Sequence, residues 1–116
     1  MIKALVGYNI FPGMTPVEYD AWLWQIHVPD LLANPHIDKI VFNTVLQPVQ
    51  WTSGDADQVE NGITLYRIAE MHFKSLEAYQ RYRDWFKEHP LPVERGPKGR
   101  TDFKFYLLCQ VAEATR

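Results

Sequence analysis

The chain has 116 residues, of which 47% are hydrophobic and 14% aromatic, and its formal net charge is −2 at pH 7. This length fits one domain, residues 1–116, and the apolar content is typical of a packed core rather than of disorder. A charge near zero argues against a nucleic-acid partner, because proteins that bind phosphates usually carry a clear positive excess. No run reaches the roughly 18 apolar residues of a membrane span, so a membrane partner is also not expected.

The N-terminal run MIKALVGYNIF lacks the long apolar region and small-residue cleavage site of a signal peptide, and it is interpreted as a strand over residues 2–10. The single cysteine, Cys109, rules out an internal disulfide and fits a cytoplasmic location. Its place inside a strand predicts a small, buried apolar side chain.

The first helix is expected over residues 16–27. Thr15, Pro16 and Glu18 form a capping box with proline at the first helical position. Helical spacing places four apolar side chains on one buried stripe: Tyr19, Trp22, Leu23 and Ile26. Pro29 biases Val28 away from helical dihedrals, so PDLLANP is expected to begin a separate short segment.

The remaining elements are two strands, a helix and a last strand. Strands are predicted over residues 37–47 and 63–73, separated by a polar surface loop, 48–62. Ser75 caps a helix over 76–89, in which Glu77 and Arg81 form a favourable i,i+4 pair. The apolar stripe of this helix comprises Leu76, Tyr79, Tyr82 and Phe86. A strand over 103–111 and a frayed tail, AEATR, complete the chain.

The order β-α-β-β-α-β predicts an α+β, ferredoxin-like fold with a four-stranded antiparallel sheet and two helices on one face. Alternation along the last strand places Phe103, Phe105 and Leu107 on one face, and Tyr106 and Leu108 on the other. Both faces of the sheet therefore carry apolar side chains. The face without helices needs a cover, and a second copy of the chain is the simplest one, so we expect a homodimer through the sheet faces.

His27 is the first candidate for chemistry. Imidazole titrates near neutrality and acts as a general acid or base. On helical periodicity His27 lies at the edge of the stripe that contains Tyr19, where a side chain can line a cleft. The alternative is a partly buried histidine that caps the helix C-terminus, where its charge suits the helix dipole.

Other candidates surround a possible pocket. Arg67, Ala69 and Met71 share one face of their strand, and His72 lies on the other. Arg67 can hold a ligand carboxylate or enolate oxygen, or form an ion pair at an interface or the surface. Five aromatic residues can frame a pocket for a flat apolar ligand or serve as core: Tyr8, Tyr19, Trp22, Tyr79 and Tyr82.

No metal or organic cofactor is expected. The four histidines show no short metal-ligand spacing, and His36 and His89 stand at the ends of elements. The basic run that includes Arg95, Lys98 and Arg100 lacks the spacing of a phosphate-binding motif and is interpreted as a solvated loop.

Three stretches carry a resemblance to a known family: PGMTPVEYDAWLWQIHVP at 12–29, AEMHFKSLEAY at 69–79, and the closing aromatic strand. Over about residues 2–111 the chain resembles the EthD-like branch of the dimeric α/β-barrel superfamily. The resemblance implies two ferredoxin-like chains whose sheets form a barrel, with chemistry in a cleft between helices and sheet. In the methylmuconolactone isomerase branch, a histidine at the position of His27 lies in that cleft, and the position of Met71 carries a cysteine.

The functional expectation is a cofactor-independent enzyme or binder that acts on a small apolar molecule, aromatic or polyketide-like, in a catabolic pathway. His27 is its general acid/base, and Arg67 or a tyrosine hydroxyl orients an oxygen. The ligand-binding residues are Tyr8, Tyr19, Trp22, Met71 and Tyr82. The alternatives are a non-catalytic accessory protein that binds a hydrophobic compound, and a structural dimerisation module.

Overall fold

The computed structural model describes residues 1–46 and 64–116, so the expected loop over 48–62 lies outside the described residues. The elements in chain order are β1 (Ile2–Ile10), α1 (Pro16–Trp22), the π-helical turn η1 (Leu23–His27), α2 (Val28–Leu32), β2 (Lys39–Thr44), β3 (Arg67–Phe73), α3 (Leu76–Glu88), the 3₁₀ turn η3 (Val93–Arg95) and β4 (Thr101–Gln110). No helix in this described part is long and apolar enough to cross a membrane.

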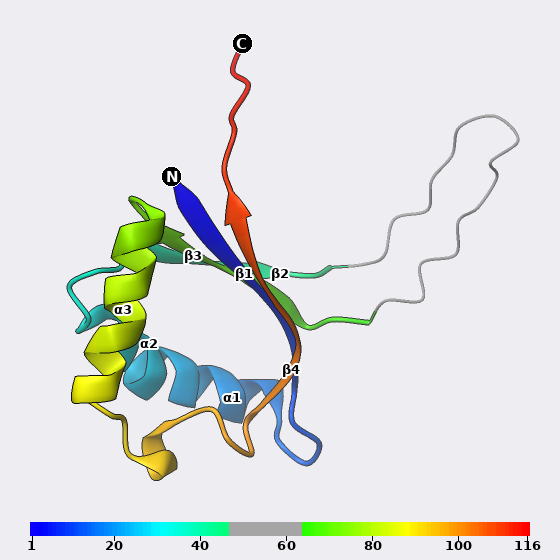
Figure 1. Ribbon diagram of the computed structural model, residues 1–116. Coiled ribbons are helices and arrows are strands. Elements are labelled where there is room, and N and C mark those ends of the chain that lie inside the picture. The colour runs from blue at the N-terminus through cyan, green and yellow to red at the C-terminus, as the bar shows by residue number, and fades with distance from the viewer. Residues whose placement is uncertain (47–63) are drawn as a thin grey trace, which may run out of the picture.

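The four strands form one antiparallel sheet in the order β2-β3-β1-β4. The helices lie on one side of this sheet, and the other side carries no helix (Figure 1). The predicted ferredoxin-like fold is therefore confirmed. We call the side that the helices cover the helix face, and the opposite side the outer face.

The strands lie where they were predicted, but β2 and β3 are shorter than expected. Strand β2 covers only Lys39–Thr44 of the predicted 37–47, and β3 begins at Arg67. Strict alternation along residues 63–73 predicts Tyr66 on the same face as His72. The structure places Tyr66 on the helix side instead, because its ring lies 6.1 Å from that of Tyr19 and its hydroxyl donates to Asp20.

The prediction that the first helix ends at residue 27 is wrong, because the chain that becomes helical at Pro16 stays helical through Pro29. The capping box at Thr15 and Glu18 is present as expected. However, Val28 has helical dihedrals (φ −60°, ψ −47°), and its N–H donates to the carbonyl of Leu23 in a wide π-type turn. Because Pro29 needs no backbone donor and follows this wider turn, the chain stays helical to Leu32.

Strand β4 contains a β-bulge that changes the predicted faces. Gly7 pairs with Phe105 and Tyr8 with Phe103, so Lys104 is an extra residue without a partner on β1. The bulge shifts the alternation by one residue. Phe103 is therefore on the helix face, whereas Phe105 and Leu107 are on the outer face; the prediction that these three share a face is wrong.

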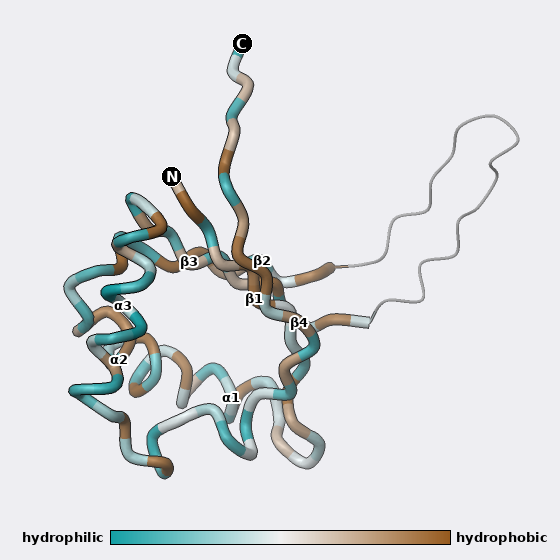
Figure 2. Tube along the Cα trace, in the orientation of Figure 1, coloured by the Kyte–Doolittle hydropathy of each residue, from teal (hydrophilic) through white to brown (hydrophobic). Residues whose placement is uncertain are grey.

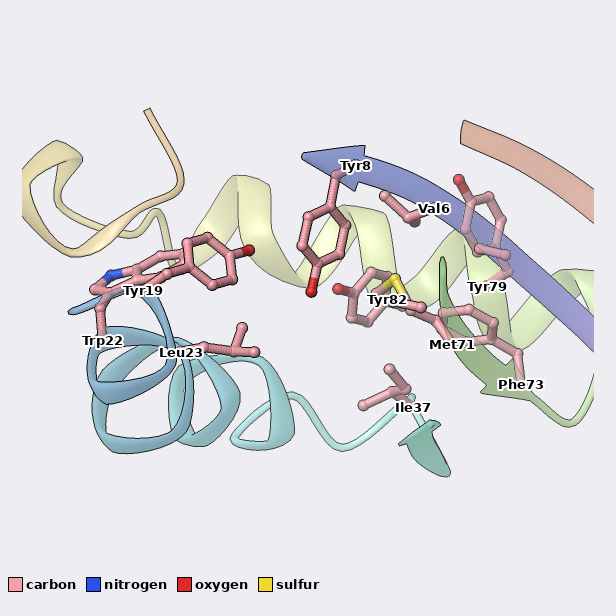
Figure 3. Close-up of a cluster of buried hydrophobic side chains, with 12 residues drawn as sticks. Val6, Tyr8, Tyr19, Trp22, Leu23, Ile37, Met71, Phe73, Tyr79 and Tyr82 are labelled. Atoms are coloured by element: carbon pink, nitrogen blue, oxygen red, sulfur yellow. The ribbon is translucent and has the colours of Figure 1, made fainter. Parts of the chain in front are cut away.

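The core lies between the helix face and the helices (Figures 2 and 3). Most of α3 has hydrophilic colours in Figure 2, and its buried residues are the tyrosines Tyr79 and Tyr82. Tyr79 and Tyr82 of α3 meet the ring of Phe73 edge-to-face at 5.1 and 5.0 Å. Leu76, which the stripe places in the core, is 59% exposed. It is the first residue of the helix, where the chain has not yet turned onto the sheet.

A buried amide fixes α2 relative to α3. Asn34 is 1% exposed, and its side chain donates to the carbonyl of Tyr82 at 2.9 Å and accepts from the N–H of His36 at 3.0 Å. These bonds satisfy polar groups that would otherwise be buried unpaired. They join the segment that follows α2 to the backbone of α3.

Candidate functional site

A cavity of about 230 Å³ lies between the helices and the helix face. Its walls come from all four strands, from α1, η1, α2 and α3, and from the loop that carries Pro97. The lining residues are Val6, Tyr8, Tyr19, Leu23, His27, Leu31, Ile40, Phe42, Ala69, Met71, Tyr82, Pro97, Thr101, Phe103 and Tyr106. The walls are predominantly apolar and aromatic, with a few polar atoms, which is the usual composition of a small-molecule site.

Five of the seven residues named from the sequence line this cavity: Tyr8, Tyr19, His27, Met71 and Tyr82. Trp22 and Arg67 do not. The structure thus brings together groups from β1, α1, η1, β3 and α3. Their roles in binding or chemistry stay predictions.

Tyrosine hydroxyls are among the polar groups of the cavity. In Figure 3 the hydroxyl ends of Tyr8, Tyr19 and Tyr82 point into the space between the helices and the sheet. The Tyr19 hydroxyl is hydrogen-bonded to Oγ1 of Thr101 at 2.9 Å. The buried Tyr8 hydroxyl has no hydrogen-bond partner among the described residues. Burial raises the pKa of both Tyr8 and Tyr82 well above the ordinary tyrosine value, so both are protonated at neutral pH.

His27 is held as a neutral imidazole. Burial lowers its pKa to about 4; the positive charge of Arg100 contributes to this direction, and the carboxylate of Asp30 opposes it. Its Nδ1 is buried and has no hydrogen-bond partner in the described part of the chain. A neutral imidazole at pH 7 can accept a proton or a hydrogen bond, which is what a general base requires.

Trp22 lies behind His27 and fixes its ring. The two rings are stacked with centroids 4.6 Å apart and an interplanar angle of 18°. Trp22 is itself anchored, because its Nε1 donates to the carbonyl of Arg95 at 3.0 Å and the Arg100 guanidinium lies 5.2 Å from its ring centre. Trp22 therefore contacts the site through His27 rather than through the cavity wall.

Arg67 is fully engaged within the chain. Two of its nitrogens donate to the two carboxylate oxygens of Asp20, and Nε donates to Oγ1 of Thr44 at 2.9 Å. The guanidinium also lies 4.6 Å from the centre of the Tyr66 ring. The ion pair joins α1 to β3. The role of Arg67 in holding a ligand oxygen stays a prediction.

The other polar candidates lie away from the cavity. His72 is on the outer face, opposite Met71 as predicted, with Nε2 3.4 Å from a Glu70 oxygen that also pairs with Lys3 at 2.8 Å. Cys109 is a free thiol of intermediate exposure rather than the buried residue expected. The described residues contain no group of three or more metal-ligating side chains.

The prediction from the sequence did not include two polar residues, one in the cavity wall and one beside it. Thr101 is the hydrogen-bond partner of Tyr19, and Asp20 neutralises Arg67. Asp20 carries a signal that was available: a carboxylate next to the buried stripe residue Tyr19 is a natural partner for a charged residue inside a strand. Thr101 carries none, because its approach to Tyr19 depends on how β4 enters the sheet after a loop.

Comparison with known proteins gives the fold and nothing finer. The chain matches no protein-family model, and no curated protein sequence matches it. The crystal structure of At3g17210 from Arabidopsis thaliana is similar, with a TM-score of 0.57 at 15% sequence identity over 100% of this chain and 98% of that one. At this identity the likeness supports the ferredoxin-like fold alone.

Proposed function

We propose that this chain is an EthD-like dimeric α/β-barrel protein that binds a small, largely apolar molecule in the cavity and acts on it without a cofactor. One observation carries the proposal. Tyr8 and His27 each present a buried polar atom that has no partner within residues 1–46 and 64–116, and both residues line the same apolar cavity. Such atoms are costly to leave unsatisfied, and a ligand with a polar group would supply the missing partner.

In the proposed reaction His27 is the base. With a pKa of about 4 it is uncharged at neutral pH and can take a proton from a weakly acidic carbon or hydroxyl of the ligand. The protonated Tyr8 hydroxyl donates a hydrogen bond to the ligand oxygen on which negative charge then develops. A tyrosine is favoured over Arg67 for this task, because the guanidinium of Arg67 is already bound to Asp20 and Thr44.

The assembly we propose is a homodimer through the outer faces, in the reducing environment that a free Cys109 fits. All four strands place apolar side chains on that face: Leu5, Val41, Ile68, Phe105 and Leu107. His72, buried beside Glu70, would then lie at the edge of the dimer interface. Burial of such a face against a second copy is the usual solution for an antiparallel sheet with two apolar faces.

A non-catalytic binder is the second candidate. A pKa of about 4 also makes His27 a weak base, and its stack on Trp22 suits a residue that shapes the wall without reacting. Such a protein would protect or deliver a hydrophobic compound within a degradation pathway.

Ligand capture with matched variants tests the proposal. Wild type, His27→Phe and His89→Phe are incubated with metabolite extract of the source organism, washed and denatured, and retained compounds are identified by mass spectrometry. His89 is the matched control because it also stacks on a tryptophan, Trp85, at 4.1 Å, but is exposed at the end of α3.

We expect wild type and His89→Phe to retain or convert the same compound, and His27→Phe to retain it unconverted or to lose it. Equal retention without conversion by all three proteins would favour the non-catalytic binder. No retained compound in any of them would contradict the small-molecule site.

A further inference from the structure

We propose that the cavity selects an uncharged ligand, a molecule of one or two rings that carries a hydroxyl or carbonyl group, and rejects a carboxylate on the same skeleton. This inference rests on the proposed function, because it specifies the ligand of that site. It is argued from the charges that surround the cavity, from its unpartnered polar atoms and from its size.

The cationic side chains around the cavity are already bound elsewhere. Arg67 donates to both oxygens of Asp20 and to Thr44, and its side chain is only 10% exposed. Arg100 donates to the carbonyl of Gly96 at 2.8 Å and lies over Trp22. Arg95 forms two 2.9 Å hydrogen bonds with the carboxylate of Asp30. None of these three arginines is among the described residues that line the cavity.

The cavity wall itself is neutral at pH 7. Among the described lining residues there is no lysine, arginine, aspartate or glutamate. Burial keeps Tyr8 and Tyr82 protonated and His27 uncharged. A carboxylate or ammonium group placed here would lose its hydration without gaining an opposite charge, which is the costliest way to bury an ion.

The two unpartnered polar atoms indicate that the ligand is not a plain hydrocarbon. The Tyr8 hydroxyl donates or accepts, and Nδ1 of a neutral imidazole does either according to its tautomer. A ligand hydroxyl satisfies both kinds of partner, and a carbonyl satisfies the donor. A site with buried polar groups discriminates against an analogue that leaves them unpaired.

The size of the cavity limits the skeleton. A volume of about 230 Å³ is below the range of roughly 300–1,000 Å³ that drug-sized ligands occupy. Rings of Tyr8, Tyr19 and Phe42 contribute flat walls, which suit a planar ligand. A two-ring aromatic compound is therefore a suitable probe.

Three probes of one skeleton test the charge selection: 2-naphthol, naphthalene and 2-naphthoate, with affinities measured by calorimetry at pH 7. We expect wild type to bind 2-naphthol at least about tenfold more tightly than 2-naphthoate, because the carboxylate is buried without a partner. We expect naphthalene to bind roughly three- to tenfold more weakly than 2-naphthol, the effect of one net hydrogen bond.

Removal of one hydroxyl locates the contact. Tyr8→Phe should lower the 2-naphthol affinity roughly three- to tenfold and leave naphthalene unchanged. Tyr66→Phe, which removes a hydroxyl bonded to Asp20 outside the cavity lining, should change neither. Because the three-probe comparison uses wild-type protein, it holds even if Tyr8→Phe affects folding.

The outcomes separate this inference from the function it rests on. Binding of 2-naphthoate as tight as that of 2-naphthol would overturn the selection for uncharged ligands and leave the cavity as a binding site. Equal loss of 2-naphthol affinity in Tyr8→Phe and Tyr66→Phe would overturn the role of the Tyr8 hydroxyl. Binding of none of the three probes would contradict the binding site itself, and the proposed function with it.

Discussion

His27 and His89 show how the same local pair acquires different properties. Each imidazole stacks on a tryptophan about one helical turn earlier in the chain, at 4.6 Å for Trp22 and 4.1 Å for Trp85. His89 is exposed, and its Nδ1 lies 2.9 Å from the carbonyl of Trp85. His27 is packed against the cavity, without such a partner for Nδ1. Burial against the cavity therefore distinguishes His27 from the exposed His89.

The buried imidazole makes folding stability depend on pH in a defined window. The pKa of His27 is 6.5 in the unfolded chain and about 4 in the folded one. The folded state thus binds fewer protons, and stability falls as pH decreases from 6.5 towards 4. The difference corresponds to about 2 kcal/mol once the partial exposure of the ring is considered.

We therefore expect His27→Phe to lose less stability than wild type between pH 6.5 and pH 4, by about that amount. Urea denaturation at a series of pH values measures it. His89→Phe is the matched control for replacing an exposed histidine that also stacks on a tryptophan. Parallel curves for wild type and His27→Phe would show that His27 titrates normally in the folded state.

The position of His27 could be predicted from the sequence, but its ionisation could not. Helical spacing from Tyr19 places it at the edge of the buried stripe, and it does line the cavity. Its pKa depends first on burial, which only the packed structure sets, and then on Asp30 and Arg100, which come from beyond Pro29 and from a distant loop. Likewise Arg67 was recognisable as a buried charge, whereas its partner Asp20 became identifiable only when α1 was placed over β3.

At the scale of elements, the structure differs from the prediction where the regular periodicity of a helix or a strand is interrupted. The π-type turn at Leu23–His27 and the bulge at Lys104 each change the register by one residue. Neither has a sequence signal as clear as the capping box at Thr15 or the N-cap at Ser75, both of which were predicted correctly. Local hydrogen bonds between a side chain and the backbone can be predicted from neighbouring residues in the sequence. Register shifts cannot, because they depend on how the segment pairs with another element.

Gly7 is required by the strand that lies beside it. A Cβ at this position would lie 2.1 Å from the ring of Phe105, which covers the glycine on the outer face. We expect Gly7→Ala to reduce the free energy of unfolding by about 1–3 kcal/mol, because the ring must move. Chemical denaturation measures the change.

Two variants control this prediction. Gly96→Ala should be nearly neutral, since a Cβ there approaches nothing closer than 3.6 Å. Phe105→Leu combined with Gly7→Ala should recover part of the loss, because the smaller side chain leaves room. Equal stability of Gly7→Ala and Gly96→Ala would contradict the steric account.

At the scale of the whole molecule, the proposed homodimer depends on the outer face. Leu107 of β4 is 54% exposed there, whereas Leu76, exposed to 59%, lies on α3 on the other side of the sheet. We expect Leu107→Lys to convert the dimer to a monomer and Leu76→Lys to leave it dimeric, as measured by sedimentation. A charge buried in an apolar interface opposes association. A wild-type monomer at micromolar concentration would contradict the proposed assembly.

The bulge at Lys104 also affects the free border of the sheet. In the described part of the chain β4 is an outermost strand, and its backbone groups on one side have no neighbour in the sheet. A long, regular apolar strand in this position invites further strands to add and aggregate. The extra residue breaks the spacing of those groups, and it does so with a lysine that pairs with Asp102 at 3.0 Å. The irregularity that turns Phe103 towards the cavity thus also protects the chain against edge-to-edge polymerisation.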